Sequence, residues 1–148
     1  MTHYVRFEYR GKTGYGIKNG GTIDVLDRNF LEDAKPTGEQ LQLADVRLLS
    51  PVVPPNIICI GLNYKPHAAE FGMKLPELPL IFLKTTTALT GPEETIILPK
   101  IAPDCVDYEG ELVIIIGKTA KDVSEEEADD YIFGYTTGND VTARDIQN

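Results

Sequence analysis

Residues 107–117 read Asp-Tyr-Glu-Gly-Glu-Leu-Val-Ile-Ile-Ile-Gly and contain the longest apolar run of the chain, from Leu112 to Ile116. A short run that is apolar at every position is typical of a strand buried on both faces. Gly117 follows the run directly and marks its end. The stretch therefore predicts a buried strand.

Two carboxylates, Glu109 and Glu111, lie on either side of Gly110 where this strand begins. Residues two apart in an extended chain point to the same face, so these side chains would repel each other where water is scarce. A bound cation would supply the opposite charge that both carboxylates need. The alternative is that both glutamates face solvent at the end of the strand and bind nothing. The spacing alone leaves both interpretations open.

Asp140 is a candidate for a third carboxylate. Thr142 and Asp145 have the spacing of a capping box, which predicts that a helix begins just after Asp140. Oxygen ligands favour hard cations over zinc or copper. An ion held by Glu109, Glu111 and Asp140 would therefore be a hard cation such as Mg²⁺, Mn²⁺ or Ca²⁺.

Arg144 and Gln147 are three residues apart, so they are expected to share one face of that helical turn. The arginine could bind a substrate carboxylate with both arms of its guanidinium, and the glutamine could hold a neighbouring oxygen. The alternative for Arg144 is a surface ion pair with Asp140 or Asp145.

His67 and Glu70 form a second pair at a spacing of three, again on a predicted helical turn. A carboxylate that accepts a hydrogen bond from one ring nitrogen sets the tautomer and raises the basicity of the other nitrogen. Such a pair can take a proton from water or from a carbon acid. The alternative is a surface His–Glu pair without chemistry.

The first fifty residues are expected to form a small β module. Val5, Phe7 and Tyr9 alternate with charged residues, as in a half-buried strand, and glycines punctuate the next stretch. Residues 41–49 suit a helix and a strand equally well. The proline-rich segment 50–55 then prevents any helix or central strand from continuing, and marks the boundary between this module, residues 1–50, and a second domain, residues 56–148.

The second domain is expected to add more strands and short helices. Further strands are predicted at residues 56–60, 80–83 and 95–98, and a short helix between Pro66 and Gly72. Ser124 and Glu127 suggest a capping box for a helix from Glu125 to about Phe133. The fold class predicted is therefore mainly β with short helices (α+β).

Composition narrows the range of partners. The 148 residues include 14 Lys+Arg against 23 Asp+Glu, a net charge of −9, which argues against nucleic acid or an anionic membrane as the main partner. Cys59 and Cys105 are expected to be buried thiols in a reducing compartment. With no signal-like apolar segment near the start, a cytoplasmic location is expected.

Three motifs in order resemble the fumarylacetoacetate hydrolase family. They are GLNYKPHAAE (residues 61–70), DYEGEL (residues 107–112) and GYTTGNDVTARDIQ (residues 134–147). The resemblance covers the chain from about residue 56 onward, and residues 1–50 resemble the small N-terminal domain of many members. It implies a mixed β roll or sandwich that is usually dimeric.

The resemblance also implies roles for the candidate residues. Glu109, Glu111 and Asp140 would bind Mg²⁺ or Mn²⁺. The His67–Glu70 dyad would lie on a mobile segment that closes over the substrate, and Arg144 and Gln147 would hold the oxygens of the substrate. The substrate would be a 2-oxo or 1,3-diketo acid that reacts through a metal-bound enolate, by C–C bond hydrolysis, decarboxylation or tautomerisation. The N-terminal module together with these motifs resembles the branch named 2-hydroxyhepta-2,4-diene-1,7-dioate isomerase.

Members of that family continue for about as many residues again and contribute a further active-site lysine, so residues 56–148 are expected to be the first half of the catalytic domain. A homodimer, or association with the missing C-terminal half, would then complete the core. The competing hypothesis is a catalytically silent fragment that binds a cation or mediates dimerisation.

Overall fold

The computed structural model describes residues 1–70 and 72–147. Its contacts divide the chain into two compact units. The first unit comprises Met1–Phe30 and Lys35–Glu94, and the second comprises Leu31–Ala34 and the chain from Thr95 onward. The fold is mainly β with short helices, as the sequence predicted.

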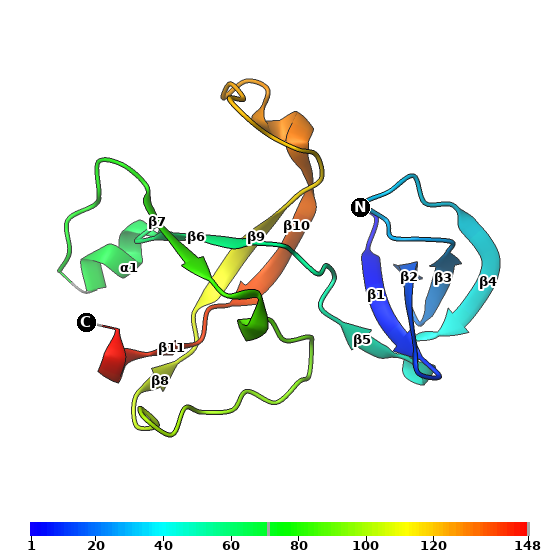
Figure 1. Ribbon diagram of the computed structural model, residues 1–148, viewed down its shortest axis with the longest axis horizontal. Helices are drawn as coiled ribbons and strands as arrows, with labels where there is room; N and C mark the ends of the chain where they lie inside the picture. Colours follow the sequence, from blue (N-terminus) through cyan, green and yellow to red (C-terminus); the bar gives the residue numbers. More distant parts are fainter. Residues whose placement is uncertain (71, 148) are drawn as a thin grey trace. The chain divides into compact units, whose positions relative to one another are not determined.

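The N-terminal part of the first unit is a five-stranded antiparallel sheet with the strand order β4-β3-β2-β1-β5 (Figure 1). Its elements are β1 (Tyr4–Tyr9), β2 (Lys12–Asn19), β3 (Thr22–Leu26), β4 (Pro36–Gln42), the 3₁₀ helix η1 (Leu43–Asp45) and β5 (Arg47–Leu49). The alternation at Val5, Phe7 and Tyr9 is confirmed as strand β1. The ambiguous residues 41–49 divide between the end of β4, one 3₁₀ turn and β5.

A small apolar core lies in this sheet. Phe7, Ile23, Leu26 and Phe30 are each no more than 6% exposed. Phe7 pairs with Gly14 across β1 and β2, where a Cβ atom would come within 2.6 Å of the Phe7 ring. The missing side chain is thus what lets the Phe7 ring lie against the neighbouring strand.

The remainder of the first unit contains one antiparallel strand pair and one short α-helix. Its elements are β6 (Ile57–Gly61), α1 (Lys65–Glu70), β7 (Leu80–Lys84) and the 3₁₀ helix η2 (Thr86–Ala88). Strands predicted at 56–60 and 80–83 are confirmed. Gly72 lies just beyond α1 with a φ of +64°, and the Met73 N–H donates to the Ala68 carbonyl, which satisfies an end group of the helix.

The second unit contains two antiparallel strand pairs. Its elements are β8 (Val106–Asp107), β9 (Gly110–Ile116), the 3₁₀ helix η3 (Ala128–Tyr131), β10 (Ile132–Asn139), β11 (Thr142–Ala143) and the 3₁₀ helix η4 (Arg144–Ile146). β9 pairs with β10, and β8 pairs with β11. Figure 1 shows β9 and β10 side by side, joined through the long connection that contains η3.

The helix predicted at residues 125–133 is wrong. The capping contact itself forms, since the Ser124 hydroxyl donates to Glu127 Oε2 at 2.9 Å. Only a 3₁₀ turn follows, because Ile132 pairs with Ile116 and begins strand β10. Ile132 and Phe133 favour a strand because one is β-branched and the other aromatic, and pairing with β9 provides hydrogen bonds for the backbone of this segment. The predicted helix after Asp140 is likewise only the single 3₁₀ turn η4.

The strand predicted at residues 95–98 is also wrong, since residues 94–99 have no regular structure. Ile96, Ile97 and Leu98 are all largely exposed. A strand needs a partner for its backbone hydrogen bonds, and within the described residues no strand pairs with this segment.

The strand in residues 107–117 is confirmed as β9, but it is not buried on both faces. Leu112, Ile114 and Ile116 are 61%, 48% and 55% exposed, whereas Glu111, Val113 and Ile115 on the other face are half-buried. β9 lies in a two-stranded sheet, so one face has no covering layer in the described chain.

Two further observations concern the whole chain. Cys59 is half-buried and Cys105 is exposed, so the expectation of a buried thiol is wrong for Cys105. In the part of the chain that the structure describes, no helix has the length and apolar character needed to cross a membrane.

Candidate active site

The three candidate metal ligands lie at one end of the β9–β10 pair. Glu109 immediately precedes β9, Glu111 is its second residue, and Asp140 follows the last residue of β10. Glu111 is paired with Gly138, and the Asp140 N–H donates to the Glu109 carbonyl at 2.8 Å. The strand register therefore brings two stretches that are thirty residues apart in the sequence to the same place.

Local hydrogen bonds hold this end of the hairpin. The Glu109 N–H donates to Asn139 Oδ1 at 3.0 Å, and the Thr142 hydroxyl donates to the Asp140 carbonyl at 3.1 Å. Thr142 is buried. A Cβ atom at Gly138 would lie 2.8 Å from Val113 Cγ2, so a larger residue there would disturb the strand that carries Glu111. Asn139 was not singled out from the sequence, although it directly precedes Asp140 in the third motif.

Arg144 reaches the same region through the second strand pair. Thr142 pairs with Asp107 across β11 and β8, and the Arg144 N–H donates to the Cys105 carbonyl at 2.8 Å. The short ladder thus places the first residue of η4 beside the segment that leads into β9.

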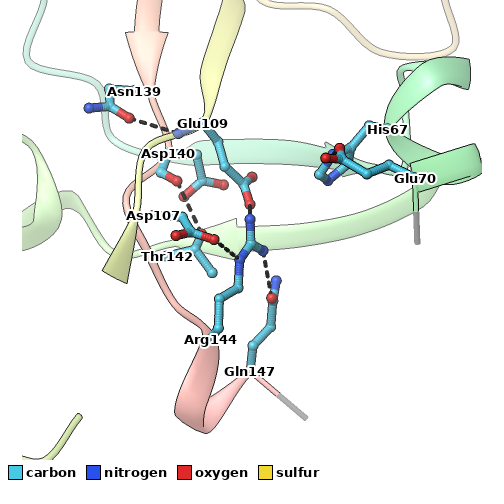
Figure 2. Close-up of polar contacts among 9 residues, drawn as sticks. All are labelled: His67, Glu70, Asp107, Glu109, Asn139, Asp140, Thr142, Arg144 and Gln147. Atoms are coloured by element: carbon cyan, nitrogen blue, oxygen red, sulfur yellow. Dashed lines mark hydrogen bonds and ion pairs between the residues drawn. The ribbon is translucent and has the colours of Figure 1, made fainter. Parts of the chain in front are cut away.

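The Arg144 guanidinium binds three side chains, as Figure 2 shows. Nε donates to Asp107 Oδ2 at 2.9 Å, Nη1 donates to Gln147 Oε1 at 2.7 Å, and Nη2 lies 2.5 Å from Glu109 Oε1. The predicted proximity of Arg144 and Gln147 is confirmed. Arg144 forms ion pairs with Asp107 and Glu109, which precede β9 in the chain, whereas its spacing in the sequence suggested a surface ion pair with Asp140 or Asp145.

Burial makes this cluster electrostatically strong. The side chains of Arg144 and Glu109 are each only 19% exposed, whereas that of Asp107 is 51% exposed. The hydrogen bond to Asp107, joined by the interaction with Glu109, raises the pKa of Arg144 above its ordinary value, against the opposing effect of burial. Arg144 is therefore a permanent cation in contact with one of the proposed metal ligands.

The donor atoms at this end of the hairpin suit a hard divalent cation, since Glu109, Glu111 and Asp140 all offer carboxylate oxygens. Their side chains are not gathered around a single point, however. Within residues 1–70 and 72–147, no three side chains of His, Cys, Asp or Glu are close enough together to share one metal ion. In this arrangement, the cation that Glu109 contacts is Arg144.

The His67–Glu70 pair lies on α1, in the first unit. Nδ1 of His67 is 3.7 Å from Oε2 of Glu70, and the two side chains are 36% and 73% exposed. The prediction that they share one face of a helical turn is confirmed. At 3.7 Å the contact is longer than a hydrogen bond, so the carboxylate does not yet hold the ring in the way that catalysis by a dyad would need.

A pocket of about 240 Å³ lies in the second unit. Asp107 and Asn139 supply its polar side chains, and the remaining lining residues are Ile96, Leu98, Val106, Tyr108 and Val141. None of the candidate site residues predicted from the sequence lines it. The two polar lining residues are the ones that bind Arg144 and the Glu109 backbone, so the pocket adjoins the charged cluster.

Comparisons with known families match almost the whole chain. Residues 56–148 match the family described as "Fumarylacetoacetate (FAA) hydrolase C-terminal", and residues 2–51 match "Rv2993c-like, N-terminal". The gap between the two matched ranges falls within the proline-rich segment, residues 50–55.

Similar proteins include enzymes with named reactions. The chain is 41% identical over 140 residues to oxaloacetate tautomerase YisK of Bacillus subtilis, a match that covers 88% of this chain and 46% of that protein. The crystal structure of 2-hydroxyhepta-2,4-diene-1,7-dioate isomerase from Mycobacterium marinum matches with a TM-score of 0.86 and 38% identity, over 99% of this chain and 57% of that one. Maleylpyruvate hydrolase from Sphingobium sp. SYK-6, solved with manganese(II) and pyruvate, matches with a TM-score of 0.73 and 28% identity, over 97% and 60%.

The chain spans about half the length of the curated relatives that it matches. The matched half contains all the candidate site residues described above, from His67 to Gln147.

Proposed function

The chain belongs to the fumarylacetoacetate hydrolase family, and we propose that it carries the metal-binding half of an enzyme that acts on a 2-oxo or 1,3-diketo acid. The main support is the cluster at the end of the β9–β10 pair, where Glu109 and Asp140 are adjacent and Arg144 contacts Glu109. Residues 1–50 would form the accessory β module, and residues 56–148 the first half of the catalytic domain.

Glu109, Glu111 and Asp140 would hold the metal ion, with Mg²⁺ or Mn²⁺ preferred and Ca²⁺ a further option. The manganese(II) in the structure of the Sphingobium hydrolase supports the use of a divalent ion. When bound, such an ion polarises a carbonyl oxygen and stabilises the enolate that develops as a C–C or C–H bond breaks.

Arg144 and Gln147 would orient the carboxylate of the substrate. Their side chains already lie together, with Nη1 of Arg144 donating to Oε1 of Gln147 at 2.7 Å. A planar guanidinium offers parallel donors to both carboxylate oxygens, which fixes the direction of the substrate as well as its position.

His67 would move the proton. Its Nδ1 faces Glu70 at 3.7 Å, and a modest approach would let that carboxylate accept a hydrogen bond and leave Nε2 as the base. The base would take a proton from the carbon acid in tautomerisation, or from the attacking water in hydrolysis.

Tautomerisation of oxaloacetate is the reaction to test first, because it is the reaction in the name of the Bacillus relative. Hydrolysis of an acylpyruvate and decarboxylation of oxaloacetate pass through the same kind of enolate, so the residues above would serve all three.

A second polypeptide surface would complete the catalytic domain. The exposed apolar residues of β9 and β10, such as Ile114 and its cross-strand neighbour Tyr135, suit contact with the remaining half of a family catalytic domain or with a second copy in a homodimer. A native subunit mass near twice the 16.4 kDa of this chain would support the first of these. Cytoplasmic location stays a prediction from the sequence.

The test of the metal site is isothermal titration calorimetry with MnCl₂ and MgCl₂. Glu109→Gln keeps the size of the side chain and removes its charge, and should weaken binding at least about tenfold. Glu39→Gln in β4, an exposed glutamate of the N-terminal sheet, is the matched control and should leave the affinity unchanged. An unchanged affinity in Glu109→Gln would refute the proposed metal site.

The test of catalysis is the change in oxaloacetate absorbance in the presence of Mn²⁺. His67→Ala should abolish turnover and leave the Mn²⁺ affinity unchanged, because His67 is not among the proposed ligands. Metal binding without any turnover by the native protein would instead favour the silent cation-binding module.

A further inference from the structure

We propose that Asp107 is a positioning residue for Arg144: its carboxylate orients the guanidinium and so determines how Arg144 meets the carboxylate of a substrate. The proposal rests on the function proposed above, in which Arg144 binds the substrate. It adds a residue that lies outside the candidate set supplied by the sequence.

Backbone pairing places Asp107 and Arg144 beside each other. Asp107 in β8 pairs with Thr142 in β11, and the Arg144 N–H donates to the Cys105 carbonyl at 2.8 Å. Arg144 is two residues beyond the strand partner of Asp107, a diagonal position that a long side chain can reach. The backbone bonds that hold β8 against β11 therefore also keep the two side chains within reach of each other.

The bond between the two side chains involves the guanidinium nitrogen that is nearest to the backbone. Nε of Arg144 donates to Oδ2 of Asp107 at 2.9 Å (Figure 2). Because the guanidinium is planar and rigid, a bond at Nε restricts rotation of the whole group and sets the directions of the N–H groups on Nη1 and Nη2. Asp107 thus controls the direction of the donors that would reach a substrate.

Asp107 differs from the other two side chains that Arg144 contacts in Figure 2. Gln147 accepts a hydrogen bond from Nη1 at 2.7 Å and is itself proposed to hold a substrate oxygen. Glu109, which lies 2.5 Å from Nη2, also has a proposed role of its own. Asp107 has no proposed contact with a ligand, so its bond to Nε can remain in place while a substrate binds.

The exposure of Asp107 suits it to a permanent contact. Its side chain is 51% exposed and keeps contact with water, whereas that of Arg144 is 19% exposed. The hydrogen bond to Asp107 is the largest cause that raises the pKa of Arg144, and the interaction with Glu109 adds to it against the effect of burial. Asp107 therefore compensates the charge of a guanidinium that water reaches only in part.

The experiment compares Asp107→Ala and Asp107→Asn with the native chain in the oxaloacetate assay with Mn²⁺. Asp107→Ala removes the acceptor of the Nε–H and should lower kcat/KM at least about tenfold, because a misdirected guanidinium misplaces the substrate. Asp107→Asn keeps an acceptor oxygen in the same place, so kcat/KM should stay within about threefold of the native value. An effect of charge alone has the opposite sign, since loss of an anion beside the site would favour an anionic substrate and lower KM in both variants.

Asp107→Glu covers the case in which Asp107→Ala does not fold. It keeps the charge and moves the carboxylate by one methylene group, so kcat/KM should fall further than in Asp107→Asn. The reverse order, with Asp107→Glu closer to the native value, would assign the role to charge and overturn the positioning role.

Asp27→Ala is the matched control. Asp27 also binds an arginine, Arg28 at 3.0 Å, but it lies in the first unit, directly after β3. Its loss removes the same charge from the chain and should leave kcat and KM unchanged. A decrease in kcat/KM equal to that of Asp107→Ala would mean that the effect does not depend on Arg144, and would overturn the positioning role.

A nuclear magnetic resonance measurement separates positioning from general damage to the site. Exchange of the Arg144 Nε–H with water, followed in ¹⁵N-labelled protein, should accelerate at least about tenfold in Asp107→Ala and much less in Asp107→Asn. The backbone N–H of Arg144, which bonds to the Cys105 carbonyl, should exchange at the native rate in both variants. Faster exchange at both groups would show that the strand pair itself is disturbed, and unchanged exchange at Nε would show that Asp107 does not hold the guanidinium; either result would overturn the positioning role.

The outcomes separate this inference from the proposed function. Native values of kcat and KM in Asp107→Ala would overturn the positioning role and leave the proposed function standing. The absence of turnover in the native chain would overturn the proposed function and this inference together, whatever the exchange rate of the Nε–H.

Discussion

The N-terminal sheet and the β9–β10 hairpin contain similar apolar residues, but these side chains are buried in the sheet and exposed on one face of the hairpin. In the sheet, Phe7 and Ile23 are 2% and 0% exposed, whereas Ile114 and Ile116 of the hairpin are 48% and 55% exposed. Five strands and the segment that carries Phe30 enclose one core, but a two-stranded sheet cannot cover its own faces.

The buried core and the candidate site residues therefore lie in different parts of the chain. The N-terminal sheet has a closed core and holds none of the candidate site residues. The hairpin carries the charged cluster at one end and an open apolar face along its length. Leu112, Ile114 and Ile116 are exposed on that face of the hairpin.

Phe7→Ala should have the largest effect on stability. Loss of a fully buried phenylalanine leaves a cavity in the N-terminal core and should lower the free energy of unfolding by about 3–5 kcal/mol. Denaturant unfolding followed by circular dichroism measures this. Phe82→Ala in β7, where the phenylalanine is 38% exposed, is the control and should lose much less. Equal losses would contradict the contrast in burial.

Gly16→Ala should have the next largest effect. A Cβ atom there would meet Ile23 Cγ2 and also the Asp24 carbonyl oxygen at 2.8 Å, so backbone as well as side chain must move. We expect a loss of about 1–3 kcal/mol in the same unfolding experiment. Gly21→Ala has open space around its Cβ position and should be nearly neutral. A neutral Gly16→Ala would mean that the N-terminal sheet is more adaptable than its close contacts indicate.

Ile114→Thr should change the free energy of unfolding by less than about 0.5 kcal/mol if its face is open to water. Ile115→Thr, on the half-buried face of the same strand, should cost about 1 kcal/mol or more. A large loss in Ile114→Thr would show that a second chain covers this face in solution. Light scattering over a range of concentrations would then show self-association that the substitution weakens.

Asp27→Asn should have the smallest effect, and the effect should depend on pH. The bonds of Asp27 to Arg28 and to the Lys35 N–H lower the pKa of its carboxyl group in the folded protein. The stabilisation is therefore present above the ordinary carboxyl range and is lost as pH falls through the lowered pKa. Melting temperatures of the native and variant chains, compared between about pH 7 and about pH 2, should converge at the acid end. A difference in melting temperature that persists at low pH would show that the effect of Asp27→Asn does not come from the charge of the carboxylate.

Local features of the site were predictable because they depend on residues close in the sequence. The spacing of His67 and Glu70 placed them on one helical face, and the spacing of Arg144 and Gln147 placed their side chains in contact. Where the local pattern did not determine the secondary structure, the presence or absence of a partner strand determined it. Residues 132–133 joined β10 because Ile116 offered a partner, while residues 95–98 remained irregular for want of one.

The amino-acid sequence alone determined the family, the mainly β fold and the set of polar groups available for catalysis, because periodicity and motif spacing are properties of the linear chain. The contacts of Arg144 with Asp107 and Glu109 depend instead on strand pairing. They join residues 37 and 35 positions apart, and arise only because the β8–β11 and β9–β10 ladders bring these segments together. Charge partners across such separations are chosen by backbone pairing in three dimensions, which no local pattern encodes.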